Sequence, residues 1–323
     1  MAKDSYQEVC DPQGRKFSIQ ENRCRQLFEW AIDMFGGFWH LCTQGEGQAV
    51  IFCRKKDYGY MMTLIAVCAY AFPDIKIITF EVMSNHLHLL LCGPADEIMA
   101  FFAMLKKRLQ RYLSLNGTPV GLDRFGCPGL IPVESLESVR NQIVYINRND
   151  YIVDPDQTPF SYPYGGNAYY FNPFARRYHD GRLGDLPILK RRAFLHSRET
   201  DYPDSWLLVD GYVSPVNYLS LDIGEGLFRD ARHYFHKISR DVESYREIAG
   251  QLGESLYYTD DELNSIVYRI CRRDHGGLSP AMLPPDGKME LARTLHFDYN
   301  ADNAKIARLL KMPRTVLDQM FHP

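Results

Sequence analysis

Two β-rich runs, Ile75–Val82 and Leu87–Cys92, follow each other with only the short connection through Met83-Ser84-Asn85 between them. Such a spacing predicts a hairpin or a bent pair of strands. A helical pattern over Tyr60–Phe72 precedes the pair and stops at Pro73, and a long amphipathic pattern over Ala95–Leu115 follows it. The hairpin is therefore flanked on both sides by helices, which limits the chain to folds in which helices cover a sheet.

Two further strands complete this unit. Phe38–Thr43 is predicted as a strand before the first helix, and Leu130–Val133 as a strand after the second helix. Asp57 would be the N-cap of the first helix. Ser135 then caps a helix that runs to about residue 149. The order β-α-β-β-α-β plus one helix predicts an α+β fold, a ferredoxin-like sandwich with an added element.

The length of 323 residues suggests about two domains. We expect an N-terminal helical extension over 1–37, a catalytic unit over 38–153, a loop-rich arm with connecting helices over 154–255, and a helical domain over 256–323. In the last of these, Thr259 and Glu262 fit a capping box for a helix over Asp260–Arg272.

The segment Asn303–Met320 is similar to a helix-turn-helix, in which Pro313 would start the second helix. Lys311 occupies the turn, where such motifs often carry glycine. Its candidate DNA-reading residues are Arg314, Thr315 and Gln319. A plain helical hairpin is the alternative.

Composition argues against export and membrane insertion. No apolar run approaches the ~20 residues of a membrane span, and the N-terminus has no signal-peptide pattern. The eight cysteines are scattered without a CxxC pair, which favours a reducing cytoplasm.

The net charge of −3 hides a local excess of positive charge. Residues 101–148 hold seven Lys or Arg against three acids. Such a patch suits a DNA backbone, although a solvated helix face explains it equally well. The candidate phosphate-contacting residues of this stretch are Lys106, Lys107, Arg108, Arg111 and Arg148.

The sequence His86-Leu87-His88 is the clearest chemical feature. Side chains alternate along a strand, so both imidazoles lie on one face and Leu87 on the other. Two neutral imidazoles at this spacing can bind one divalent metal if a third ligand comes from elsewhere. Two structural histidines of a strand are the alternative.

Tyr145 and Asn149 are one helical turn apart and therefore share a helix face. Beside a metal, the phenolate could serve as a nucleophile and the amide oxygen as the third ligand. The alternative is a half-buried tyrosine next to a solvated asparagine. Tyr112, with Asn116 one turn later, is a rival nucleophile, but Asn116 falls at a helix end and suits a cap.

Together and in this order, three segments resemble the single-tyrosine HUH transposases, and most closely the REP-associated tyrosine transposases: Phe38–Gly45, Glu81–Leu90 and Tyr145–Asn149. The resemblance covers about a third of the chain and implies the ferredoxin-like fold. It also implies that His86 and His88 bind Mg²⁺ or Mn²⁺, that Asn149 is the third ligand and that Tyr145 is the nucleophile.

The implied reaction is metal-dependent cleavage and rejoining of single-stranded or hairpin DNA through a 5′-phosphotyrosine, without ATP. Members of this superfamily can complete their sites between subunits, so a homodimer is compatible with the sequence. The alternatives are a non-catalytic DNA-binding protein on the same scaffold and an unrelated HxH metal hydrolase.

Overall fold

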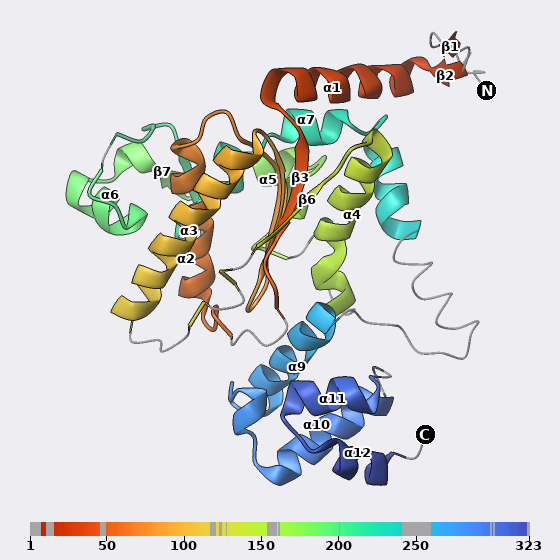
Figure 1. Cartoon of the computed structure of the whole chain (residues 1–323). Helices are drawn as coiled ribbons and strands as arrows, with labels where there is room; N and C mark the ends of the chain where they lie inside the picture. The colour runs from red at the N-terminus through yellow and green to blue at the C-terminus, as the bar shows by residue number, and fades with distance from the viewer. Residues whose placement is uncertain are drawn as a thin grey trace.

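A four-stranded sheet with helices on both faces forms the centre of the computed structural model, which is an α+β protein (Figure 1). The structure describes residues 8–10, 16–45, 50–116, 121–122, 125–126, 128–153, 160, 162–199, 201–240, 260–297, 299 and 301–321.

The four strands are those expected from the sequence, within one or two residues at their ends: β3 Phe38–Cys42, β4 Lys76–Val82, β5 Leu87–Cys92 and β6 Gly129–Pro132. They lie in the order β4-β5-β3-β6, and every neighbouring pair is antiparallel. The first and third strands of the chain segment β-α-β-β-α-β are therefore central, and its second and fourth strands are the edges.

The two faces of the sheet carry different helices (Figure 1). Helices α2 (Lys55–Tyr70) and α3 (Ala95–Leu115) cover one face, and α4 (Leu136–Val153) covers the other. Because side chains alternate along β5, His88 faces α4, whereas Leu87 and Leu89 face α2 and α3 and are fully buried. The expectation that Leu87 and Leu89 lie on the face opposite His88 is therefore confirmed.

The start of α2 differs from the expectation. The helix begins at Lys55, and Asp57 is not its N-cap but lies three residues after the cap position, Arg54. Its carboxylate accepts the backbone N–H of Arg54 at 3.0 Å, as the third residue of a capping box does. The predicted cap of α4 is confirmed, since Ser135 Oγ accepts the N–H of Ser138 at 3.1 Å. The helix itself continues four residues beyond the predicted end.

The largest buried core extends from Cys24 to Ile238. Residues of the N-terminal extension and of the arm therefore share one core with the sheet. Helix α1 (Ile19–Phe35) lies against α4 and α7 (Leu221–Gly226), and a helical segment over 231–240 follows. The remaining short elements are β1 Glu8–Cys10, β2 Lys16–Ser18, α5 Pro173–Arg177, β7 Gly181–Arg182, α6 Ile188–Leu195, β8 Leu207–Val209 and β9 Tyr212–Val213, with 3₁₀ turns at Asn167–Tyr169, Leu183–Asp185, Pro215–Asn217 and Pro280–Met282.

The C-terminal helices form a second core below the sheet (Figure 1). They are α9 Asp260–Asp274, α10 Pro285–Phe297, α11 Asn303–Leu310 and α12 Arg314–Met320. Helix α9 packs against α4, and Met83 at the end of β4 joins the second core. Lys311 has a left-handed φ of 51°, which explains why glycine suits this turn. Pro313 is the N-cap residue of α12, one position before the helix that it was expected to start. Thr259 lies outside the described residues.

Among the helices that the structure describes, none is long and apolar enough to cross a membrane.

Candidate active site

Three buried histidines gather on the sheet face that α4 covers. His86 directly precedes β5, His88 lies within it, and His40 lies on the neighbouring strand β3. Each is 5% exposed or less. The rings of His86 and His88 are 5.0 Å apart between centroids and nearly perpendicular, so the two side chains that the sequence placed on one face do meet there.

The proton on His86 is positioned by its neighbour. The Asn85 amide nitrogen donates to the Gly45 carbonyl at 2.9 Å, which turns the amide oxygen toward the ring. That oxygen, 2.9 Å from His86 Nδ1, can only accept, so Nδ1 carries the proton. The lone pair is then on Nε2. Metal-binding histidines commonly have this arrangement, in which the second nitrogen is held by an outer hydrogen bond.

His88 is held by His40 in the same way. His88 Nδ1 and His40 Nε2 are 3.1 Å apart, a hydrogen bond in which one nitrogen donates and the other accepts. When Nδ1 of His88 donates, its Nε2 has the lone pair that a metal needs. Sequence reasoning missed His40, because its role depends on pairing between strands 48 residues apart.

Burial also sets the charge of these rings. It lowers the pKa of His40 and of His86 to about 4. Burial, together with the other two imidazoles, holds the pKa of His88 well below its usual range. All three are therefore neutral at about pH 7, the form in which imidazole binds metal.

Tyr145 meets these histidines from α4 of the same chain. Its ring centroid is 5.9 Å from that of His88 and 6.1 Å from that of His40, edge-on in both cases. The guanidinium of Arg148 lies over the Tyr145 ring at 5.7 Å. The structure thus places the predicted nucleophile beside His88, one of the two predicted metal ligands, and beside His40 of the same chain.

Two polar clusters fix the position of α4. Asn147 donates to the Tyr234 hydroxyl at 2.8 Å, and its amide oxygen accepts the Thr79 hydroxyl of β4. Nearer the start of the helix, the buried Arg140 donates to both carboxylate oxygens of Glu21 in α1 and to the Leu227 carbonyl. Because both clusters bridge α4 to its neighbours, they determine how Tyr145 faces the sheet.

The rival tyrosine is in a different place. Tyr112 lies on α3, on the far side of the sheet, and its hydroxyl donates to the Asp57 carboxylate at 2.8 Å. Burial and this carboxylate raise its pKa well above the usual value, which opposes formation of a phenolate. Asn116 Nδ2 donates to the Tyr112 carbonyl at the end of α3, the capping role expected for it.

The histidine pair fits a divalent metal in donor type and charge, and the tautomer of His86 leaves its Nε2 free to bind a metal. Asn149, the predicted third ligand, lies in α4 one turn after Tyr145, and its side chain is outside the described part of the chain. Within the described ranges, no group of three His, Cys, Asp or Glu residues is placed to hold a metal. Glu81 of β4 lies opposite His88 of β5 in the strand register and is 2% exposed. A short motif does not contain this register, so the sequence alone could not identify Glu81 as a residue near the site.

The predicted DNA-contacting residues fall into separate groups. Lys107, Arg108 and Arg111 line a cavity on the outer side of α2 and α3, whereas the Lys106 ammonium lies beside Gly126. Arg148 is at the tyrosine. The three candidate DNA-reading residues of α12, Arg314, Thr315 and Gln319, are all exposed.

The chain matches no protein-family model, no curated protein and no solved structure.

Proposed function

We propose that this protein is a metal-dependent DNA strand transferase of the single-tyrosine HUH type, most similar to the REP-associated tyrosine transposases. The observation that carries the proposal is the contact of the Tyr145 ring with both His88 and His40, beside His86 with its lone pair on Nε2. A protein that only binds DNA needs none of these groups.

The fold supports the same proposal. In a ferredoxin-like sandwich of the β-α-β-β-α-β type, the first and third strands are central. The order β4-β5-β3-β6, with α2 and α3 together on one face, agrees with that arrangement. We therefore propose that the sheet with α2 and α3 is a ferredoxin-like core, and that α4 is the added helix that carries the nucleophile.

The proposed chemistry is a transesterification of single-stranded or hairpin DNA. The Tyr145 oxygen loses its proton and forms a bond to phosphorus, the bond from phosphorus to the 3′ oxygen breaks, and that oxygen leaves as a 3′-hydroxyl. The phosphoester is retained as a 5′-phosphotyrosine, so rejoining needs no ATP. His86 and His88, with Asn149 as the proposed third ligand, would hold Mg²⁺ or Mn²⁺, which stabilises charge on the scissile phosphate.

A covalent-adduct assay tests this proposal. Labelled hairpin oligonucleotides with randomised single-stranded flanks are incubated with the protein and Mn²⁺ and separated on a denaturing gel. We expect a shifted band that requires metal, survives Tyr112→Phe and disappears in Tyr145→Phe and in His86→Ala. Tyr112→Phe is the matched control, since it removes a tyrosine hydroxyl on the other side of the sheet.

A band that persists in Tyr145→Phe would refute the assigned nucleophile. If no adduct forms while the DNA still binds, the non-catalytic DNA-binding protein becomes the better assignment.

A further inference from the structure

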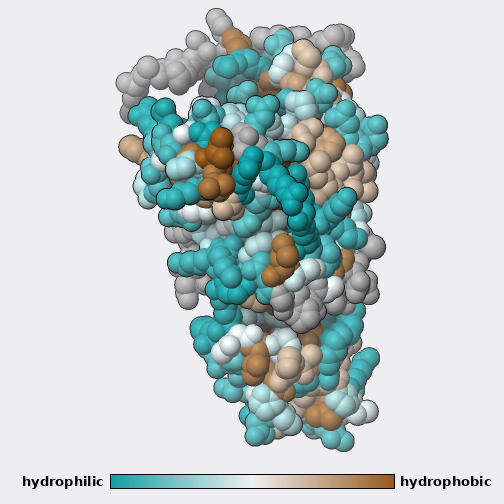
Figure 2. Space-filling model, turned by 90° about the vertical axis from the view of Figure 1, so that its left-hand side faces the viewer, coloured by the Kyte–Doolittle hydropathy of each residue, from teal (hydrophilic) through white to brown (hydrophobic). Residues whose placement is uncertain are grey.

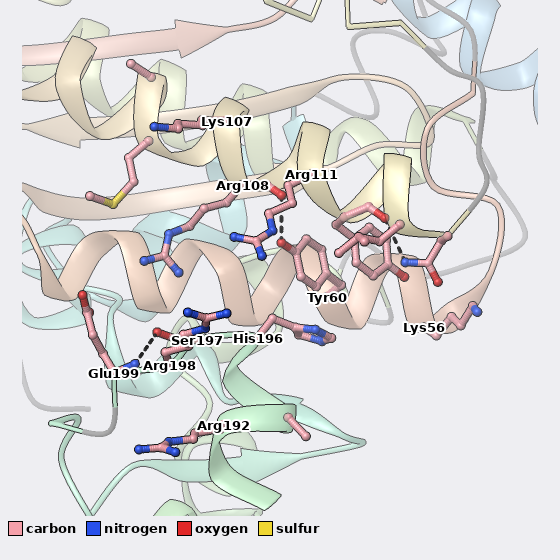
Figure 3. A pocket seen from close by; sticks show the side chains of 16 residues that line it. Lys56, Tyr60, Lys107, Arg108, Arg111, Arg192, His196, Ser197, Arg198 and Glu199 are labelled. Atoms are coloured by element: carbon pink, nitrogen blue, oxygen red, sulfur yellow. Dashed lines mark hydrogen bonds between the residues drawn. The ribbon is translucent and has the colours of Figure 1, made fainter. Parts of the chain in front are cut away.

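A cavity of about 1250 Å³ lies between α2, α3 and the segment that contains α6, on the side of the molecule away from the histidines (Figure 3). Six cations line it: Lys56, Lys107, Arg108, Arg111, Arg192 and Arg198. Among the lining residues that the structure describes, Glu199 is the only acid. Figure 2 shows this side of the molecule, where hydrophilic side chains predominate between isolated hydrophobic ones.

The cations come from three parts of the chain. Lys107 and Arg108 lie four and three residues before Arg111 on α3, so both are neighbours of Arg111 on the helix surface. Lys56 comes from the first turn of α2, Arg192 from the last turn of α6 and Arg198 from the segment after it. In Figure 3, the side chains of Arg108 and Arg111 point toward the segment of Arg198. The sequence singled out the α3 cations as phosphate contacts but not Lys56, Arg192 or Arg198, because only the fold brings them together.

His196 holds the third segment in place. It ends α6 in the left-handed conformation with a φ of 49°, which turns the chain back toward the cavity. Its ring packs edge-on against Tyr60 at 4.7 Å, and Tyr60 stacks on Tyr112 at 3.7 Å. The Tyr60 hydroxyl donates to the Arg108 carbonyl and the Tyr112 hydroxyl to Asp57, so neither hydroxyl is available for a ligand. Binding in this cavity therefore depends on the cations.

Among the described residues, one acid faces the six cations of the cavity. Within the ranges that the structure describes, none of the six cations forms an ion pair, although Arg54, Arg140 and Arg191 do so elsewhere in the chain. Gathering like charges around one cavity costs free energy that a bound polyanion recovers.

We propose that this cavity is a second DNA-binding site that holds the phosphodiester backbone of a segment away from the scissile bond. The choice of DNA rests on the proposed function. The volume of the cavity exceeds the roughly 300–1,000 Å³ that is typical of small-molecule sites. Cations from three segments of the chain are also better placed to contact successive phosphates of a strand than a single phosphate group. The sheet separates this cavity from Tyr145, so the strand it holds is anchored and not cleaved.

Binding measured without metal tests this site independently of cleavage. Fluorescence anisotropy in EDTA, with the Tyr145→Phe protein, reports DNA affinity at several salt concentrations. Six phosphate contacts in the cavity contribute about −4 to the slope of log K against log salt for a single strand, which is a loss of about 300-fold between ~50 and ~200 mM salt. The triple variant Lys107→Gln/Arg111→Gln/Arg192→Gln should therefore make the measured slope shallower by about 2.

Two neighbouring lysines of α2 provide the matched control. Lys56 lines the cavity and Lys55 does not, although both are exposed and a substitution changes the charge equally. We expect Lys56→Gln to make the slope shallower by about 0.7 and Lys55→Gln to leave it unchanged. The same measurement on a hairpin stem shows which form of DNA the cavity binds. For double-stranded DNA, each lost phosphate contact should change the slope by about 0.9 instead of about 0.7.

The proposal would be overturned if the triple variant and the protein with the unsubstituted cavity had the same slope of log K against log salt. It would also be overturned if Lys56→Gln and Lys55→Gln changed this slope equally. A protein that binds DNA through this cavity but forms no adduct would keep the second site and refute the strand transferase.

Discussion

The buried histidines make the stability of this protein sensitive to mild acid. An imidazole with a folded-state pKa below its unfolded-state value takes up its proton more readily when the chain unfolds. Above the pKa of the unfolded chain, the imidazole is neutral in both states and does not affect the free energy of unfolding. As the pH falls from the unfolded-state pKa toward the folded-state pKa, only the unfolded chain takes up the proton, so the free energy of unfolding decreases. For His40 and His86 this window runs from 6.5 down to about 4.

The magnitude follows from the same two values. For one histidine, a fall in pKa from 6.5 to about 4 corresponds to about 3 kcal/mol when the window has been fully crossed. About 2 kcal/mol of that loss falls between about pH 7 and about pH 5. His40→Gln removes one such group and retains a polar side chain next to His88. The variant should therefore lose about 2 kcal/mol less than the unsubstituted protein over this interval.

Urea denaturation in EDTA at both pH values measures the effect. The compared quantity is the change in unfolding free energy between the two pH values, so the cost of the substitution itself cancels. His179→Gln, at an exposed position, is the control for the substitution. If His40→Gln and the unsubstituted protein lose the same free energy, the reasoning from burial to protonation is wrong.

Two further stability predictions concern α4 and the C-terminal helices. Arg140→Met leaves the Glu21 carboxylate and the Leu227 carbonyl without their donor and should cost about 3 kcal/mol, measured by urea denaturation. Glu137→Gln alters only the exposed end of this cluster and should cost less than about 1 kcal/mol, so equal losses would contradict the role of Arg140. Leu310→Ala empties a fully buried position of the second core and should cost about 3 kcal/mol. Hydrogen exchange should show the loss in α9–α12 and not in β5, and equal loss in both would show that the two cores unfold as one.

Local patterns predicted the sheet and its helices, because the information lies within single segments. The alternation in Leu87–Cys92 and the helical period of Ala95–Leu115 determine both the element and its buried face. The predicted start of α2 was wrong for two reasons. An aspartate at the N-cap and an aspartate three residues later stabilise the same helix end, and the polar residues before Tyr60 show no periodic spacing of apolar side chains.

The site was only partly predictable for a similar reason. His86, His88 and Tyr145 belong to short motifs, whereas the partner of His88 comes from β3, and Arg192 joins Lys107 only after α6 has folded onto α2 and α3. Such groupings depend on the pairing of distant segments, which no window of residues contains.

The contact of Met83 with the C-terminal core has a consequence for how the protein can be shortened. Met83 lies three residues before His86, and α9 packs on the helix that carries Tyr145, so the C-terminal unit contacts both the segment before His86 and the helix of the tyrosine. Deleting residues 260–323 would expose Met83 and the side of α4 that contacts α9. A fragment that contains only the sheet and its helices is therefore a perturbed protein, and measurements on it would not report the properties of the whole chain.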